Sequence, residues 1–302
     1  MDYSKLPTEK QNPRTASLDT HSIKKILQLI DREDRLVPRA VAKARPALTR
    51  AVELIVSSLK KGGRLIFVGA GTSGRLGVLE AAECPPTFNT PPGLVQAVMA
   101  GGKRSVFRSQ EGAEDRESEA RREVRRRVRK GDVVVGISAS GVTPFVGGAL
   151  AEARKKGART ILVACNLTSP LGWAVDVLIA PKTGPEVIAG STRLKAGTAT
   201  KLILNRLTVT AMIRLGKVYE NWMVDLQPHS KKLRHRALRI LKRFGGVPET
   251  KARSLLKMAH GRTKAAILMA QKNISYSEAL RILKKNDGFL RKALTHKVPG
   301  TF

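Results

Sequence analysis

Five short apolar runs, rich in Val and Ile, constrain the fold of this chain more than any other feature. They are "RLIFVGA" (64–70), "LVQAVMA" (94–100), "DVVVGIS" (132–138), "RTILVAC" (159–165) and "DVLIAP" (176–181). Such runs are typical of parallel strands that are buried on both faces. Helical patterns lie between and after them, near 74–83, 105–129, 144–156 and 192–216. This alternation predicts a doubly wound, mostly parallel α/β sheet in a three-layer sandwich of the flavodoxin-like or Rossmann-like kind.

Helices alone are predicted at both ends of the chain. The polar arm up to Leu18 is predicted to be irregular, a first helix to start after a cap at Asp19 or Thr20, and a second helix to span about 46–60. Four helical patterns follow the sheet, near 231–243, 249–258, 263–271 and 276–285. We therefore expect an N-terminal arm with helices (1–50), an α/β domain (51–226) and a small all-helical domain (227–302).

The charge of the chain is unusual. Lys and Arg number 56 against 24 Asp and Glu, a net charge of +32. Residues 231–302 contribute 19 − 3 = +16, and "RREVRRRVRK" (121–130) adds a second basic run. Such charge attracts nucleic acid, anionic lipid or phosphorylated small molecules. Nucleic-acid binding is the competing interpretation, but the chain shows no aromatic-rich surface on which bases would stack.

Other classes of protein are disfavoured by what the sequence contains. No apolar stretch approaches the roughly 18 residues that a membrane span needs, and the first residues have no apolar signal region, so we expect a cytoplasmic protein. The two cysteines, Cys84 and Cys165, are too isolated for a disulfide scaffold and are interpreted as structural thiols. The five histidines are scattered without metal-ligand spacing, so no metal site is expected.

The stretch "GAGTSG" (69–74) matches the glycine pattern of dinucleotide-binding loops, and it follows a strand and opens a helix. A dinucleotide loop is normally followed by an acid at the end of the next strand, but that strand runs into Gly101-Gly102-Lys103-Arg104. Lys103 and Arg104 would suit the additional phosphate of NADP, so NADP remains an alternative ligand for this loop. Thr72 and Ser73, in contrast, place two hydroxyls at a helix N-terminus, which suits a terminal phosphate.

A second loop, "SASGVTP" (138–144), repeats this chemistry after the third predicted strand. It offers the hydroxyls of Ser138, Ser140 and Thr143, and Gly141 allows a ligand to approach the backbone closely. The hydroxyls of a single loop serve equally well as helix caps. Two such loops at neighbouring strand ends, where ligands bind in doubly wound sheets, favour a shared phosphate site.

Several motifs in order resemble a known family. "GGRLIFVGAGTSGRLGVLEAAECPPTF", "EGAED" (111–115), "DVVVGISASGVTPFV", "GPEVIAGSTRLKAGTATKLILN" and "GKVYENWMVD" are similar to segments of the bacterial N-acetylmuramic acid 6-phosphate etherases, which have the sugar-isomerase (SIS) phosphosugar-binding fold. The resemblance runs from "TEKQNP" through the helical tail, which is similar to that family's ubiquitin-associated-like (UBA-like) domain. It implies a homodimer with sites near the subunit interface.

The resemblance implies a lyase that removes D-lactate from the C3 ether of N-acetylmuramic acid 6-phosphate and leaves N-acetylglucosamine 6-phosphate, without a metal or redox cofactor. The family's catalytic glutamates correspond to Glu83 in "AECPP" and Glu114 in "EGAED". Elimination needs one group to take the C2 proton and another to protonate the departing lactate. We expect Glu83 to be the acid and Glu114 the base. Without the resemblance, both would be interpreted as surface acids near helix ends.

Further anion-binding groups are expected along "GPEVIAGSTRLKAGTATK" (184–201). Ser191 and Lys195 are candidates for the phosphate or lactyl carboxylate, and Glu186 for the sugar hydroxyls. The complete set of predicted substrate-binding residues is Thr72, Ser73, Gly74, Ser138, Ser140, Gly141, Thr143, Glu186, Ser191 and Lys195.

Three positions depart from the family pattern: Val142 stands where an arginine is usual, Leu167 where a proline is usual, and Ala189 where a threonine is usual. None of these changes removes a proposed catalytic carboxylate.

The alternative function is a non-catalytic sensor or regulator. Such a protein can have the same fold, because fold does not fix function. Transcription regulators with the SIS fold carry a helix-turn-helix domain ahead of the sugar domain, and residues 1–50 do not show such a pattern.

Overall fold

The computed structural model describes residues 4, 6–226, 228 and 230–296. Contacts between residues divide it into two units. The sheet unit comprises Met1–Ala82 and Gly93–Val209, and the helical unit comprises Glu83–Pro92 and Thr210–Phe302. This division differs from the predicted boundaries after residues 50 and 226, because helices α4 (Gly71–Phe88) and α8 (Lys195–Arg214) each begin in the first unit and end in the second.

A five-stranded parallel sheet forms the centre of the sheet unit, as predicted. Its strand order is β2-β1-β3-β4-β5, all pairs being parallel. Gly69 at the end of β1 lies between Met99 of β2 and Ile137 of β3, so the carboxyl ends of these strands are level with one another. The strands are β1 (Leu65–Gly69), β2 (Val95–Met99), β3 (Val133–Ile137), β4 (Arg159–Val163) and β5 (Val177–Ile179).

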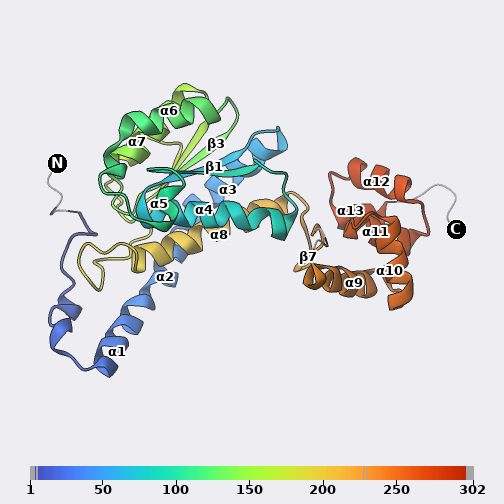
Figure 1. Cartoon of the computed structure of the whole chain (residues 1–302), viewed down its shortest axis with the longest axis horizontal. Coiled ribbons are helices and arrows are strands. Elements are labelled where there is room, and N and C mark those ends of the chain that lie inside the picture. The colour runs from blue at the N-terminus through green and yellow to red at the C-terminus, as the bar shows by residue number, and fades with distance from the viewer. Residues whose placement is uncertain (1–3, 5, 227, 229, 297–302) are drawn as a thin grey trace. The chain divides into compact units, whose positions relative to one another are not determined.

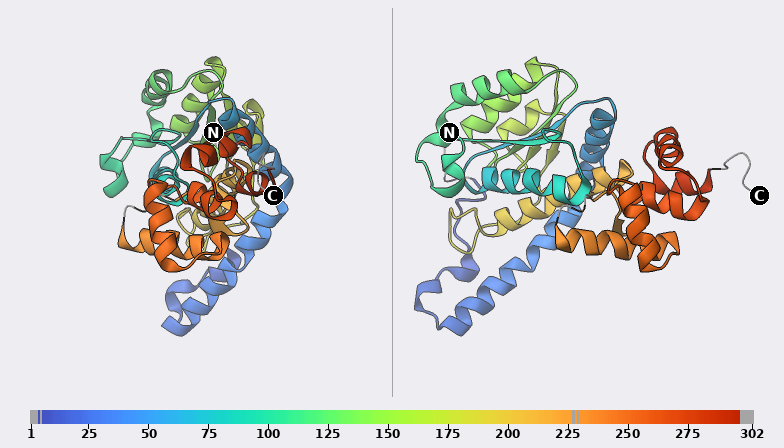
Figure 2. Two further views of the ribbon diagram at one scale, coloured as in Figure 1. Left: turned by 90° about the vertical axis from the view of Figure 1, so that its right-hand side faces the viewer. Right: turned by 45° about the vertical axis from the view of Figure 1, so that its right-hand side comes forward.

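Helices cover both faces of this sheet (Figure 1). On one face α6 (Glu117–Arg127) and α7 (Pro144–Lys155) bury Ala120, Val124 and Phe145 against strand residues such as Ile66 and Val134. On the other face lie α3 (Arg45–Lys60), α4 and α8, and Figure 2 shows the same three layers from other sides. A Cβ atom on Gly77 of α4 would lie 3.0 Å from the Cβ of Phe67, so this helix packs directly on the sheet. The predicted three-layer sandwich is confirmed.

The N-terminal region is more ordered than the sequence indicated. Within the arm, short 3-10 turns form at Pro13–Thr15 and Leu18–Thr20. The first helix, α1 (Ile23–Asp34), is capped by the Ser22 hydroxyl, which accepts from the Lys25 amide at 3.4 Å, so the predicted cap at Asp19 or Thr20 was wrong. An additional helix, α2 (Leu36–Lys43), precedes α3; it was missed because Pro38 lies in its first turn and resembles a helix break.

The helix predicted over 105–129 is also wrong in part. The structure has α5 (Arg104–Phe107), a 3-10 turn at Ala113–Asp115 and only then α6. Gly112, with φ +68°, separates these pieces, since a left-handed residue cannot continue a helix. Glu114 therefore lies in a turn ahead of α6 rather than within a long helix.

The helical unit has its own apolar core. Its helices are α9 (Lys231–Gly245), α10 (Glu249–Met258), α11 (Thr263–Lys272), α12 (Tyr276–Lys285) and α13 (Leu290–Thr295). The first four confirm the predicted helical domain, whereas α13 and a small antiparallel hairpin of β6 (Val218–Tyr219) and β7 (Trp222–Met223) were missed because they are so short. The core includes Leu241, Leu256 and Ile267. Over the residues that the structure describes, no helix combines the length and apolarity that crossing a membrane requires.

Candidate active site

The first glycine loop joins β1 to α4 and presents backbone and side-chain donors together. A Cβ on Gly74 would lie 2.5 Å from the carbonyl oxygen of Gly69, so only glycine allows the helix to start so close to the strand. Gly71 takes the left-handed conformation, with φ +52°. The first N–H groups of α4 have no carbonyl partner within the helix. In the part of the chain that the structure describes, the half-buried hydroxyls of Thr72 and Ser73 also have no protein partner.

The second loop joins β3 to α7 and is held by its own hydroxyls. The Ser138 Oγ atom lies 2.7 Å from the Thr143 Oγ1 atom and accepts the amide of Gly141 at 3.1 Å. Ser138 is buried, so its hydroxyl organises the loop, whereas Ser140 and Thr143 are half-buried at the surface of the loop. Gly141 has φ +74°, which lets the chain turn back towards α7.

The start of α8 lies against both loops. Ala139, between the two serines of the second loop, packs with Cys165 and with Ala196 in the first turn of α8. A Cβ on Gly197 would lie 3.7 Å from the Cγ2 atom of Thr72 in the first loop. The carboxyl ends of β1, β3 and β4 and the N-terminus of α8 thus converge on one place, which is where ligands bind in doubly wound sheets.

Both predicted structural thiols are buried, Cys84 in α4 and Cys165 after β4. Burial raises the pKa of Cys165 to about 11, so it remains a neutral thiol near pH 7. Beside the two loops it therefore acts as a small apolar side chain.

The carboxylate of Glu186 caps the N-terminus of helix α8. This carboxylate accepts the amide of Lys195 at 2.9 Å and the amide of Ala196 at 2.8 Å, and burial raises its pKa. A carboxylate in this position satisfies the exposed N–H groups and the dipole of α8. Ser191 is half-buried shortly before the helix. Direct contacts of Glu186 and Ser191 with a ligand remain predictions.

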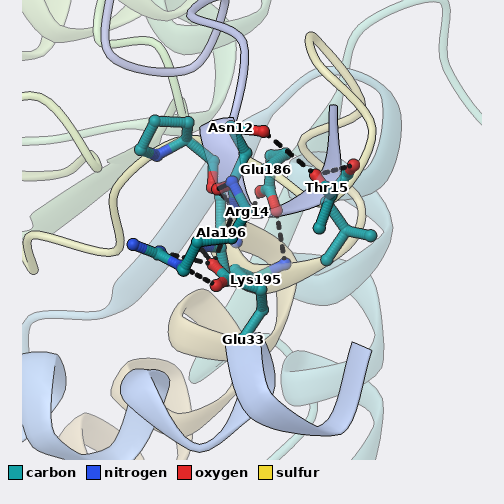
Figure 3. A network of polar contacts seen from close by, with 9 residues as sticks. Asn12, Arg14, Thr15, Glu33, Glu186, Lys195 and Ala196 are labelled. Carbon is teal, nitrogen blue, oxygen red and sulfur yellow. Dashed lines mark hydrogen bonds and ion pairs between the residues drawn. The ribbon is translucent and has the colours of Figure 1, made fainter. Parts of the chain in front are cut away.

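The side chain of Lys195 is paired with a carboxylate from the N-terminal region (Figure 3). Its Nζ atom lies 2.6 Å from the Glu33 Oε2 atom, with the two side chains 0% and 1% exposed. The arm adds two donors to Glu33, Asn12 through Nδ2 at 2.8 Å and Arg14 through Nη2 at 3.0 Å. Hydrogen bonding from Arg14, with smaller contributions from Lys195 and Asn12, lowers the pKa of Glu33 to about 2. A direct contact between Lys195 and a ligand also remains a prediction.

Sequence reasoning missed Glu33, Asn12 and Arg14. One signal was present: Glu33 continues the apolar stripe that Ile23, Ile26 and Ile30 begin at helical spacing, and an acid at such a position needs a buried partner. Nothing in the sequence indicates that this partner is a lysine 162 positions away.

Three family models match the chain. They are the glucokinase regulatory protein N-terminal SIS domain over residues 47–154, the SIS domain over 113–210 and the C-terminal lid domain of glucokinase regulatory protein over 220–276. A phosphoheptose isomerase from Francisella tularensis shares the fold, with a TM-score of 0.51 and 17% identity over 64% of this chain and 100% of that chain.

Closer relatives cover almost the whole chain. The N-acetylmuramic acid 6-phosphate etherase of Oceanobacillus iheyensis is 47% identical over 95% of this chain and 98% of the relative. That of Symbiobacterium thermophilum is 51% identical over 89% of both. The chain belongs to the etherase family. The resemblance found in the motifs is therefore confirmed.

Both glutamates that match the etherase motifs are exposed. Glu83 lies near the C-terminal end of α4, and Glu114 lies in the turn between α5 and α6. Exposure leaves both carboxylates accessible to a substrate. Their catalytic roles remain predictions.

The three departures from the etherase pattern lie at or near the loops. Val142 is half-buried in the second loop, and its amide points to the Ser140 hydroxyl at 3.4 Å. Leu167 is 50% exposed after β4, and Ala189 is exposed before α8. Val142 offers no guanidinium to a bound anion, so any such contact would come from other groups.

Proposed function

We propose that this chain is a carbon-oxygen lyase that cleaves the lactyl ether of N-acetylmuramic acid 6-phosphate. The products are N-acetylglucosamine 6-phosphate and D-lactate, and the reaction serves the recycling or catabolism of cell-wall amino sugars. The observation that carries this proposal is the near full-length similarity, at 47–51% identity, to proteins named as this etherase. The two hydroxyl loops at one edge of a parallel sheet support a phosphosugar as the ligand.

In the proposed site the first loop binds the phosphate. The hydroxyls of Thr72 and Ser73 and the first amides of α4, up to Gly74, would donate to the phosphate oxygens at the positive end of the helix dipole. From the second loop, Ser140 and Thr143 would add neutral donors, with Gly141 allowing close approach. Ser138 would act mainly by holding this loop in shape, because its hydroxyl is already bonded within it.

The proposed reaction is an elimination followed by addition of water. Opening of the sugar ring gives an aldehyde at C1, which acidifies the C2 proton. Glu114 would remove this proton, and the electron pair would form a C2–C3 double bond as the C3–O bond to lactate breaks. Glu83 would protonate the departing lactate oxygen, and water would then add across the double bond with its hydroxyl at C3 and its proton at C2. Two carboxylates in different environments can divide such roles.

We also propose that the enzyme acts in the cytoplasm as a homodimer. Exposed apolar side chains in the sheet unit, Leu79 on α4 at 47% and Val209 on α8 at 40%, support a surface that a second chain covers. Sedimentation of the purified protein tests this, and a monomer at micromolar concentration would contradict it.

The direct test of the function is to incubate the purified chain with N-acetylmuramic acid 6-phosphate and to measure D-lactate. We expect release by the wild-type chain and loss of release in Glu83→Gln. Wild-type rates in Glu83→Gln would remove that residue from the mechanism. Tight binding of the sugar phosphate without any lactate would instead favour a sensor built on this fold.

A further inference from the structure

The N-terminus of α8 carries two buried carboxylates rather than one. Glu186 accepts the amides of Lys195 and Ala196, and Glu33 accepts the side chain of Lys195. Lys195 is therefore held by its backbone and by its ammonium group at the same time. Because an ion pair with almost no exposure is weakly screened by solvent, this contact restrains α8 more strongly than a surface pair would.

The restrained turn packs on the second loop and lies close to Thr72 after β1. Ala196 packs on Ala139 of the second loop, and the Cα of Gly197 carries no side chain where Thr72 of the first loop approaches. A displacement of this turn would therefore move against the groups proposed to bind phosphate. Both side chains are almost fully buried, Lys195 at 0% and Glu33 at 1% exposure, and they are paired with each other.

The other end of the network is the N-terminal arm. Asn12 and Arg14 donate to Glu33, and the Thr15 hydroxyl donates to the carbonyl of Val187 at 2.9 Å. The Gly190 amide donates to the carbonyl of Thr8 at 3.0 Å. The arm thus binds the segment before α8 at several points, and Figure 3 shows how Asn12, Arg14 and Lys195 converge on Glu33.

We propose that Glu33 and Lys195 are a positioning pair for the phosphate site. The pair holds the first turn of α8 in its packing on Ala139 and at its present distance from Thr72, and thereby sets the spacing of the two groups of hydroxyls. This assignment rests on the proposed function for the identity of the ligand, and it gives Lys195 an indirect role. Loss of the pair should weaken phosphosugar binding far more than it slows the chemical step.

Three variants test the pair. Lys195→Met removes the ammonium, and Glu33→Gln removes the carboxylate charge. The double variant Glu33→Gln/Lys195→Met leaves no unpaired charge in the interior, so it should fold even where a single variant does not. The matched control is Asp132→Asn, because Asp132 forms another buried ion pair, 2.6 Å from the Arg64 Nη2 atom, at the opposite edge of the sheet.

The measurements are calorimetric titration with N-acetylglucosamine 6-phosphate and with inorganic phosphate, followed by steady-state release of lactate. We expect the Kd of both ligands and the KM to rise about 10- to 100-fold in the folded variants of the pair, which is the effect of losing about one hydrogen bond to a charged group. The kcat should change less than about threefold, and Asp132→Asn should leave Kd and KM unchanged.

Unchanged affinity in the double variant would overturn the proposal, and so would an equal loss of affinity in Asp132→Asn, which would indicate general loosening. A wild-type chain that binds neither ligand would overturn it as well. If the wild-type chain releases no lactate but binds the phosphosugar, the etherase function fails while the titrations still decide the role of the pair.

Discussion

The two edges of the parallel sheet use buried charge differently. At the amino edge, Asp132 is fully buried and accepts the backbone amides of Arg64 and Arg129 as well as the Arg64 guanidinium, so its oxygens are used within the protein. At the carboxyl edge, Glu33 and Lys195 form a buried ion pair, and the hydroxyls of Thr72 and Ser73 remain half-buried. Buried charge at the amino edge therefore serves the fold, whereas the carboxyl edge keeps hydroxyl groups available, as the proposed phosphate site requires.

The largest expected effect on stability comes from the amino edge. Asp132→Asn leaves the Arg64 side chain, which is 22% exposed, without its countercharge. We expect a loss of about 3 kcal/mol in the free energy of unfolding, as is typical for one partner of a buried pair. Urea unfolding measures it, with the exposed pair Arg121–Glu117 as the control, where Glu117→Gln should cost well under 1 kcal/mol. Equal losses of unfolding free energy in Asp132→Asn and Glu117→Gln would show that the buried pair stabilises the fold no more than the exposed pair does.

The largest expected effect on catalysis comes from a carboxylate near the other edge. Glu114→Gln should reduce lactate release about 10²- to 10⁴-fold, because the proposed general base is lost. Glu111 is exposed three positions earlier in the same acidic segment, and Glu111→Gln should stay within about twofold of the wild-type rate. If both variants lose the same activity, general acidity of the segment would explain the effect better than a base at Glu114.

The parallel sheet could be predicted from the sequence, because each strand is a short apolar run that is recognisable without knowledge of its partners in the fold. The sequence also placed the Thr72 hydroxyl at the start of a helix and the Ser140 hydroxyl on a loop, each directly after a strand, and the structure confirms both positions. It could not supply the partner of Lys195, since pairing with Glu33 depends on how α1 folds back on α8. A basic residue near a predicted phosphate site suggests a ligand contact, and only the fold shows that Lys195 is buried and paired with Glu33.

The pH dependence of stability tests how much the charge of Glu33, in its pair with Lys195, contributes to the fold. The pKa of Glu33 falls from an ordinary value of 4.5 to about 2, chiefly through the hydrogen bond from Arg14. A depressed pKa stabilises the fold fully above pH 4.5, and this stabilisation disappears as the pH falls towards 2. The difference in unfolding free energy between the wild-type chain and Glu33→Gln should therefore shrink from pH 5 to pH 2, by at most roughly 3 kcal/mol. A constant difference across this range would show that the carboxylate contributes no charge-dependent stability.

The smallest of these effects tests whether the unpaired hydroxyls serve a ligand. Thr72→Val keeps the shape that Gly197 accommodates but removes the hydroxyl, which has no protein partner among the described residues. Because a hydrogen bond to a charged group contributes about 1.5–3 kcal/mol, the Kd of N-acetylglucosamine 6-phosphate should rise about 10- to 100-fold while the unfolding free energy stays within about 0.5 kcal/mol. Thr198, which is exposed directly after Gly197 in α8, provides the control, and Thr198→Val should leave the affinity unchanged. A loss of stability without a loss of affinity in Thr72→Val would mean that the hydroxyl supports the fold, and the contrast between the two sheet edges would then not extend to this loop.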